Sequence, residues 1–525
     1  MSSSRDISRF TAIFAAGTML SRVLGLVRDM AYPLLPQESR AAFITAFRLP
    51  NMLRDLVGEG ASNAAFVPVF TEVLHTRSEE EFRSLVSRAM GMMLVLLTLL
   101  TTAGVLLTPF LLYGLDAIEP FTGAKQRPDE TVHLLVALGR WTFPYLFFIG
   151  MSVFAMGALF TVRHYSTPSW SPVLLNISLI ACIVLLRDQF TEPAYALVVG
   201  VWIGGITQLA VMLWALRKHA GVLRPRFRLR DPGVLTILAL LGPVIVGQAA
   251  GEVNKLVDTM FAYNLGDLAV DALYFSNRLV QLPLSIFGMA TAAAVLPAAS
   301  AAAARQDKSG VREVILVGMR QTSFLILPSM MGLILLGEPI ARLLFEYRHF
   351  GPEETIATGR AVAIAAAGLL AFAWVKVVLA GFYAVKDTRT PVIISSACML
   401  LNIVLNILFI KPFGYMGLAA ATTIAYVVNF SVLYLMLCKR YGRMWDAPFG
   451  SSMVRMLTAT AAMTAVAYTL SVRLHPILQG DTVANRFILV AAPLGFAAAA
   501  YFALCRLMDL PELNSFVAIV RRKLK

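Results

Sequence analysis

The stretch Ser21–Phe70, SRVLGLVRDMAYPLLPQESRAAFITAFRLPNMLRDLVGEGASNAAFVPVF, decides how the rest of the chain is interpreted. Both of its halves are apolar enough to form membrane helices, yet each half contains several charged residues. A charge at the centre of a bilayer costs at least ~2.5 kcal/mol, so such side chains turn toward a protein interior or a watery cavity. The stretch therefore predicts two membrane helices that line a charged cavity.

The polar residues of this stretch fall on one side of each predicted helix. At 100° per residue, one narrow arc of the second helix holds Arg48, Asn51, Asp55, Glu59 and Ser62. One side of the first helix holds Arg22, Gly25, Arg28 and Asp29. We expect a cationic cavity that is partly balanced by acidic residues.

Composition places the whole chain in the membrane. Of its 525 residues, 58% are hydrophobic and only 14% are charged, whereas a soluble domain carries about 25% charged residues. The net charge of +14 does not indicate nucleic-acid binding, because the basic residues lie in short loops between apolar spans and form no basic domain. The four cysteines are far apart and form no cluster with histidine, which argues against a disulfide framework or a metal centre.

Apolar runs of membrane length predict an all-α polytopic membrane protein with about fourteen transmembrane helices. The runs lie near residues 8–35, 41–74, 88–113, 131–160, 169–187, 193–216, 232–263, 270–304, 313–337, 355–385, 390–410, 416–438, 453–474 and 486–508. The N-terminal segment leads directly into the first run, as expected for an uncleaved first helix. Lysine and arginine concentrate in alternate loops, which predicts that both termini are cytoplasmic.

An internal repeat divides the chain. Arg48-Leu49 in the second span matches Arg278-Leu279 in the eighth, and the loop FTVRHYSTP (160–168) matches YAVKDTRTP (383–391). Six spans separate the copies, so both copies run in the same direction and form a parallel repeat. We therefore predict two six-helix lobes, 1–220 and 221–440, followed at 441–525 by two extra helices and a basic cytoplasmic tail. Two such lobes are typical of an alternating-access transporter.

Four motifs resemble the MviN/MurJ family of lipid II flippases, within the multidrug/oligosaccharidyl-lipid/polysaccharide exporter superfamily. They are SRVLGLVRD (21–29), FRLPNMLRDLVGEGASNAAFVPVF (47–70), NRLVQLP (277–283) and VKVVLAGFYAVKDTRTP (375–391). The resemblance covers nearly the whole chain. It implies a multi-pass protein of the bacterial inner membrane that acts on a lipid-linked peptidoglycan precursor and binds its polyprenyl tail in a groove at the C-terminal helix pair. The substrate-binding residues that it implies are Arg22, Arg28, Asn51, Arg54, Arg278 and Lys376.

The sequence departs from the family pattern at three places. Ala41 and Ala42 stand where an aspartate usually precedes the AF-x-LPN motif, and Asn277 and Gln281 stand where the family often has acidic residues. With fewer titratable groups, membrane potential or sodium is a better driver than protonation at these positions. These departures leave open a flippase for another polyprenyl-linked oligosaccharide.

The remaining charges have both functional and structural interpretations. Several arginines in one cavity suit a lipid-linked diphosphate, because the guanidinium fork matches phosphate oxygens. Alternatively, Arg28-Asp29 and Arg54-Asp55 form ion pairs between helices. We expect Asp29, Asp55 and Glu59 to tune the charge of the arginines, and Asn176 to join helices by hydrogen bonds.

A sodium site is a further hypothesis. Asp258, which shares a helix stripe with Glu252 and Lys255, supplies a hard oxygen ligand, and Asn402, Asn406 and Thr422 complete the shell. The alternative for the stripe is that its charges neutralise one another. No other cofactor is expected, and we expect a monomer surrounded by membrane lipids.

Other functional classes fit less well. A cation-coupled drug antiporter of the same superfamily is disfavoured, because an arginine-rich cavity repels cationic drugs. A membrane glycosyltransferase needs carboxylates that hold a metal near the membrane surface, and the loop pairs Asp129-Glu130 and Glu353-Glu354 have no partner motif. A channel would show a selectivity-filter repeat, which is absent from the sequence. The sequence therefore favours a transporter over an enzyme.

Overall fold

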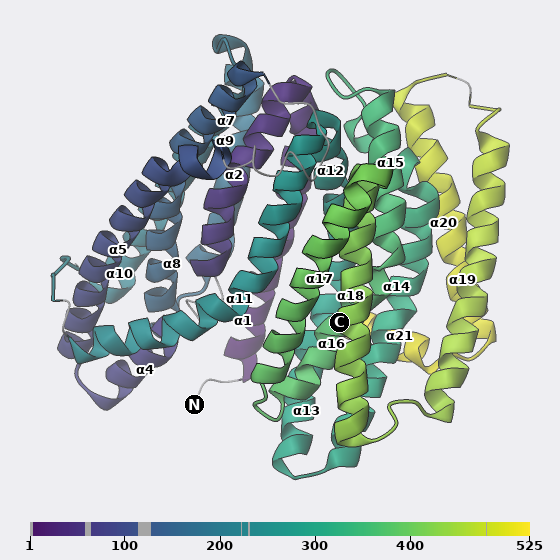
Figure 1. Ribbon diagram of the computed structural model, residues 1–525. Helices are drawn as coiled ribbons and strands as arrows, with labels where there is room; N and C mark the ends of the chain where they lie inside the picture. Colours follow the sequence, from purple (N-terminus) through teal and green to yellow (C-terminus); the bar gives the residue numbers. More distant parts are fainter. Residues whose placement is uncertain are drawn as a thin grey trace. The chain divides into compact units, whose positions relative to one another are not determined.

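The computed structural model describes residues 4–57, 65–113, 128–221, 223–228, 231–478 and 480–524. These ranges are helical and contain no strand (Figure 1). Ten of their helices are long and apolar enough to cross a membrane. The count is eleven if α15 (Pro352–Ala367) and α16 (Leu369–Tyr383), which meet at 42°, form one bent span. Each of the predicted spans coincides with one or two helices, so the prediction of an all-α polytopic membrane protein is confirmed.

The chain divides into two compact units. Unit 1 comprises Met1–Val270 with Tyr347–His349, and unit 2 comprises Asp271–Glu346 with Phe350–Lys525. The helices of unit 1 are α1 (Ser4–Ala31), α2 (Gln37–Val57), α4 (Val67–Thr76), α5 (Glu79–Tyr113), α7 (Asp129–Thr142), α8 (Tyr145–Thr161), α9 (Ser166–Leu186), α10 (Ala194–Ala220) and α11 (Pro232–Leu265).

In unit 1, helix α9 packs between α1 and α10, while α2 contacts α7, α8 and α11. Edge-to-face ring contacts join Phe66, Phe70 and Phe154 in the apolar core. Asp231 begins α11 as its N-cap, because its carboxylate accepts hydrogen bonds from the backbone N–H of Gly233 and Val234. The same carboxylate lies 2.9 Å from Nε of Arg88 on α5. The start of α11 is thus anchored to unit 1.

The helices of unit 2 surround one long helix, α14. They are α12 (Asp267–Pro283, which begins at the boundary of the units), the π-helical turn Leu284–Gly288, α13 (Met289–Ala304), α14 (Lys308–Phe345), α15, α16, α17 (Arg389–Phe413), α18 (Tyr415–Tyr441), α19 (Ala447–Leu474), α20 (Val483–Leu507) and α21 (Pro511–Leu524). Helix α14 contacts α13, α15, α16, α19 and α20. The last two stand side by side at the yellow end of the chain (Figure 1).

The predicted lobe boundary at residues 220/221 follows the sequence repeat, and it stays a prediction. Packing divides the chain later, after Val270, because α11 lies against α2, α4 and α5. Helix α21 was not predicted. Its first turn is held in unit 2 by Glu512, which is buried and lies 3.4 Å from Nε of Arg320 on α14.

The two matched loops adopt the same backbone turn. Arg163 (φ 59°) and Lys386 (φ 60°) both occupy the left-handed region. In each loop the next residue donates its N–H back to the preceding helix, from His164 to the carbonyl of Leu159 and from Asp387 to that of Phe382. This is the geometry of a helix C-terminal motif with a left-handed residue. At this turn the two loops therefore match in backbone conformation as well as in sequence.

Candidate functional site

Arg28 lies at the centre of a hydrogen-bonded group in α1 and α9. Its Nε and Nη2 donate to Oδ1 of Asp29 at 3.0 and 2.7 Å, and its Nη1 donates to Oδ1 of Asn176 at 3.2 Å. The Asn176 amide in turn donates to the carbonyl of Ser21 at 3.1 Å. The guanidinium also lies 5.7 Å from the centroid of the Tyr32 ring. Asn176 therefore joins α9 to α1, as predicted, and it also contacts the arginine.

Arg54 forms a second centre on α2. Its Nη2 lies 2.5 Å from Oδ1 of Asp55. Arg54 also interacts electrostatically with Arg28 and with Tyr145, the first residue of α8. Two arginines from different helices of unit 1 therefore lie within electrostatic range of each other. We call Arg28, Asp29, Arg54, Asp55, Tyr145 and Asn176 the paired-arginine group.

Two atoms of this group are buried without a well-formed hydrogen bond among the described residues, although the tyrosine hydroxyl lies close enough to Arg54 to interact weakly with it. They are Nε of Arg54 and the hydroxyl of Tyr145. Tyr145 is 1% exposed. The sequence pattern does not distinguish this tyrosine, because it stands in the apolar run FPYLFF, where an aromatic side chain is ordinary helix packing. Only the fold places it beside Arg54.

The alternative interpretation, in which the two Arg-Asp pairs join different helices, does not describe the pairs that form. Arg28 pairs with Asp29 and Arg54 with Asp55, in each case within one helix. Neighbouring residues on a helix point about 100° apart, but the long arginine side chain folds back to its neighbour. Because each pair lies within one helix, each guanidinium carries a local counter-charge of its own.

A third ionic group does join two helices. Glu252 of α11 lies 3.2 Å from Nη2 of Arg48 on α2 and 2.5 Å from Nζ of Lys255. The pairing of Glu252 with Lys255 was one of the two interpretations of this stripe, whereas the pairing with Arg48 was not predicted. Glu252 is 9% exposed. One carboxylate therefore bridges two cations at the contact of α2 with α11.

The remaining predicted residues of unit 1 lie apart from these contacts. Arg22 is exposed on α1, and Asn51 is half-buried on α2. Glu59 lies outside the described residues. Arg22 and Asn51 remain predicted substrate-binding residues, and Glu59 remains a predicted charge-tuning residue.

In unit 2, Arg278 contacts a tyrosine of its own helix. Its Nη2 donates to the hydroxyl of Tyr274 at 3.2 Å, and its guanidinium lies 5.1 Å from the centroid of that ring. Asn277 and Gln281, which replace the acidic residues of the family pattern, are hydrogen-bonded to each other at 2.9 Å. Lys376 is exposed on α16.

The predicted sodium ligands of unit 2 form a hydrogen-bonded cluster. Asn406 donates to Asn402 at 3.0 Å, and Asn402 donates to Thr422 at 3.1 Å, so that α17 is joined to α18. Asn402 and Asn406 are buried, at 1% and 0% exposure. Asp258 belongs to unit 1, and the four-residue sodium site stays a prediction. Across the described ranges, no group of three or more His, Cys, Asp or Glu side chains could hold a metal ion.

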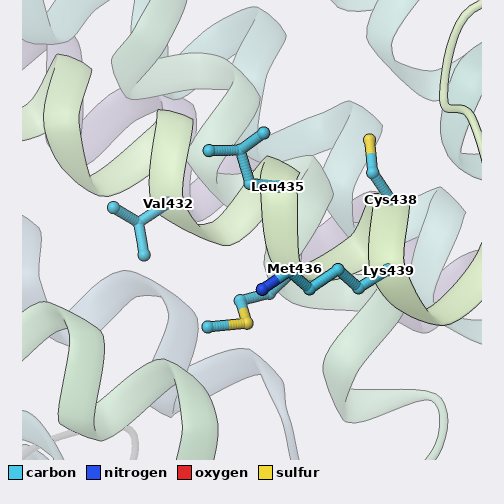
Figure 2. A pocket seen from close by; sticks show the side chains of 5 residues that line it. All are labelled: Val432, Leu435, Met436, Cys438 and Lys439. Carbon is cyan, nitrogen blue, oxygen red and sulfur yellow. The ribbon is translucent and has the colours of Figure 1, made fainter.

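A hollow of about 400 Å³ lies along one face of α18 (Figure 2). It is lined by Val432, Leu435, Met436, Cys438 and Lys439. Apart from the lysine this lining is apolar, which is ordinary for a helix of a membrane protein. It contains none of the predicted site residues.

Comparison with known proteins agrees with this architecture. The sequence profile of the family described as "Lipid II flippase MurJ" matches residues 31–487. A probable lipid II flippase MurJ of Vibrio cholerae is 35% identical, over 82% of this chain and 83% of the relative. One of Haemophilus influenzae is 32% identical, over 86% and 90%.

Solved structures share the fold. A structure of lipid II flippase MurJ in an inward closed conformation superposes with a TM-score of 0.74 at 23% identity, over 94% of this chain and 98% of the other. An inward-facing multidrug transporter of the MATE family and MOP superfamily superposes with a TM-score of 0.66 at 17% identity, over 82% and 98%. At these identities the likeness concerns the fold alone. The match of the profile and the identity to the curated relatives show that this chain belongs to the lipid II flippase MurJ family.

Proposed function

We propose that this protein moves lipid II, the polyprenyl-diphosphate-linked precursor of peptidoglycan, across the bacterial cytoplasmic membrane. The names of the curated relatives support this assignment. The observation that carries it is the paired-arginine group, in which Arg28 of α1 and Arg54 of α2 interact electrostatically. The protein acts as a transporter and not as an enzyme.

A diphosphate is the substrate group that best fits two neighbouring guanidinium groups. Each guanidinium presents a planar fork of N–H donors that matches phosphate oxygens. In the protein without substrate, Asp29 and Asp55 neutralise the two cations. When a diphosphate enters, its oxygens replace the carboxylates as acceptors. Arg22, Asn51, Arg278 and Lys376 complete the binding surface in this proposal.

The transport cycle that we propose is alternating access of two lobes, with both termini in the cytoplasm and the monomer as the active form. Membrane potential is the first candidate for the driving force. A diphosphate carries about two negative charges, and each charge that crosses the membrane field is worth ~2.3 kcal/mol per 100 mV. An inside-negative potential therefore favours outward movement of the substrate.

Sodium is the second candidate. It would bind at Asp258, Asn402, Asn406 and Thr422 and reset the empty carrier. Asp258→Asn should then weaken sodium-dependent resetting and leave substrate binding unchanged. In vesicles with voltage and sodium set independently, transport that follows only the pH gradient would contradict both candidates.

The decisive experiment is reconstitution of the full-length protein in liposomes with fluorescent lipid II. We expect lipid II to reach the opposite leaflet only in the presence of active protein. The same assay with undecaprenyl diphosphate linked to a different oligosaccharide tests the alternative substrate class. Equal transport of both lipids would show that the diphosphate is recognised and the headgroup is not. If only the second lipid is transported, that lipid and not lipid II is the substrate.

A further inference from the structure

The buried hydroxyl of Tyr145 makes no well-formed hydrogen bond to the described residues of unit 1. The ring of Tyr145 does pack: it lies 5.6 Å from the ring of Phe47, centroid to centroid, on α2. On α10, a Cβ added to Gly205 would lie 3.0 Å from Cδ2 of Tyr145, so the glycine admits the ring. The ring is thus fixed between two helices, and the direction of its hydroxyl is fixed with it.

Within the described ranges the hydroxyl makes no well-formed hydrogen bond, and neither does Nε of Arg54. The hydroxyl lies beside the Arg54 guanidinium, which can only donate to it, so the O–H of Tyr145 has no acceptor there. Leaving a buried donor without an acceptor costs stability, and in native structures such groups gather where a ligand or water supplies the missing partner. Both unsatisfied groups here are N–H or O–H donors. The partner that they lack is an acceptor, and a phosphate oxygen is the strongest acceptor in the proposed substrate.

We infer that Tyr145 is a further substrate-binding residue, whose hydroxyl donates a hydrogen bond to the phosphate group that Arg54 binds. This inference rests on the proposed function. It assigns the hydroxyl to the diphosphate and not to the sugar or peptide. Arg54 must turn from Asp55 toward the phosphate, and this rotation brings the phosphate oxygens beside the hydroxyl. Tyr145 thereby ties α8 to a site whose arginines come from α1 and α2.

Tyr145→Phe tests the inference because it keeps the ring packing and removes only the hydroxyl. Binding of undecaprenyl diphosphate and of lipid II is measured on the purified full-length protein, together with the thermal stability of the substrate-free protein. We expect the affinity for both lipids to fall about tenfold, the usual effect of one hydrogen bond to a charged group. We expect the stability without substrate to stay equal or to rise, because an unsatisfied hydroxyl is removed.

Tyr501→Phe is the matched control. Tyr501 is also 1% exposed, but its hydroxyl donates to the carbonyl of Phe324 at 2.6 Å within unit 2. We expect this variant to lose thermal stability and to bind both lipids with unchanged affinity. A loss of affinity in Tyr145→Phe and a loss of stability in Tyr501→Phe would distinguish a hydroxyl that binds substrate from one that stabilises the fold.

A double-mutant cycle with Arg54→Lys supplies the second measurement. If the hydroxyl and the guanidinium bind the same phosphate, the double variant should bind undecaprenyl diphosphate about as weakly as Arg54→Lys alone. Additive losses would overturn the inference, and so would an unchanged affinity of Tyr145→Phe or a loss confined to lipid II. If the wild-type protein binds neither lipid, the proposed function itself fails; if it binds both and only Tyr145→Phe has no effect, the inference fails alone.

Discussion

The predicted site residues of unit 1 and of unit 2 have different neighbours. In unit 1, each arginine of the paired-arginine group has a carboxylate beside it, and Glu252 bridges two further cations. In unit 2, Arg278 contacts a tyrosine, and the buried cluster of α17 and α18 consists of amides and a hydroxyl. Carboxylates can be exchanged for an anionic substrate, whereas a neutral cluster mainly holds helices together. The two matched loops share a backbone turn, whereas the polar groups of the two units differ.

The two matched turns also differ in the side-chain contacts that hold them. In unit 1, His164 stacks on His219 of α10, with ring centroids 4.0 Å apart. In unit 2, Asp387 occupies the equivalent position and lies 2.8 Å from Nη2 of Arg440 on α18. Both side chains fasten a turn to the end of a helix farther along the chain, one by ring stacking and the other by an ion pair.

The largest effect, on lipid II transport, is expected from two single substitutions, each of which removes an arginine from one unit. Arg28→Ala and Arg278→Ala should each lower lipid II transport on the order of a hundredfold, because a charge-assisted contact to the diphosphate is lost. Transport in proteoliposomes measures this, and protein yield in the membrane controls for insertion. Lysine should restore little activity at either position, since an ammonium lacks the fork. Wild-type rates with lysine at both positions would mean that the site supplies only general positive potential.

Glu252→Gln should have the next largest effect, on stability. Arg48 and Lys255 would lose their shared counter-charge at the contact of α2 with α11. Because the Arg48 and Glu252 side chains are only 18% and 12% exposed, the loss should amount to about 1–3 kcal/mol, less than for a fully buried pair. Thermal unfolding in detergent measures it.

The control for this variant is an exposed ion pair of unit 2. Glu338 lies 3.7 Å from Arg342, and its side chain is 47% exposed. Glu338→Gln should change stability by less than about 0.5 kcal/mol. Equal destabilisation by both substitutions would show that the bridge of α2 and α11 is no stronger than a surface pair.

Sequence periodicity was sufficient to locate the helices, while the predicted site residues stay a prediction. Hydropathy located the spans, and the stripe of Arg28 and Asp29 identified a polar face of α1. Spacing along one helix, however, says nothing about which helix lies opposite. The bridge from Glu252 to Arg48 spans more than two hundred residues, and for that reason it was missed.

Tyr145 and α21 were missed for different reasons. A tyrosine in an apolar run resembles packing until a neighbouring guanidinium is known, and Arg54 comes from a distant helix. The segment 511–524 is too polar to be a membrane span, and its helix is fixed by the contact of Glu512 with Arg320 on α14. Tertiary contacts, not local pattern, determine both features.

Asn402→Leu tests whether the neutral cluster of unit 2 is structural. The substitution removes the donor to Thr422 and the acceptor for Asn406. It should destabilise the protein by about 0.5–2 kcal/mol, the range for interhelical hydrogen bonds in membranes. Asn277→Leu is the control. Asn277 is exposed, and its hydrogen bond with Gln281 lies within α12. No loss of stability in Asn402→Leu would argue against a role in joining α17 to α18.

The smallest effect is expected on the pH dependence of stability, which should differ between the turn of His164 and the turn of Asp387. Burial lowers the pKa of His164 below 6.5, and the nearby His219 and Lys218 lower it further. The stability that this turn contributes is therefore intact above pH 6.5 and is lost as the pH falls through the lower pKa of the folded state. Burial raises the pKa of Asp387, but the N–H of Thr390 and the Arg440 guanidinium outweigh it, so the net pKa lies below 3.8. Asp387 consequently stays ionised in the range where His164 titrates.

Thermal unfolding at pH 7.5 and pH 5.5 makes this comparison directly. The wild-type protein should be less stable at pH 5.5, and His164→Gln should reduce that difference because the titrating group is gone. Asp387→Asn should lower stability at both pH values by a similar small amount, since its ion pair with Arg440 is half-exposed and is lost at either pH. If His164→Gln were as sensitive to acid as the wild type, the stacked histidines would not be the source of the pH dependence, and the two turns would not differ in their response to acid.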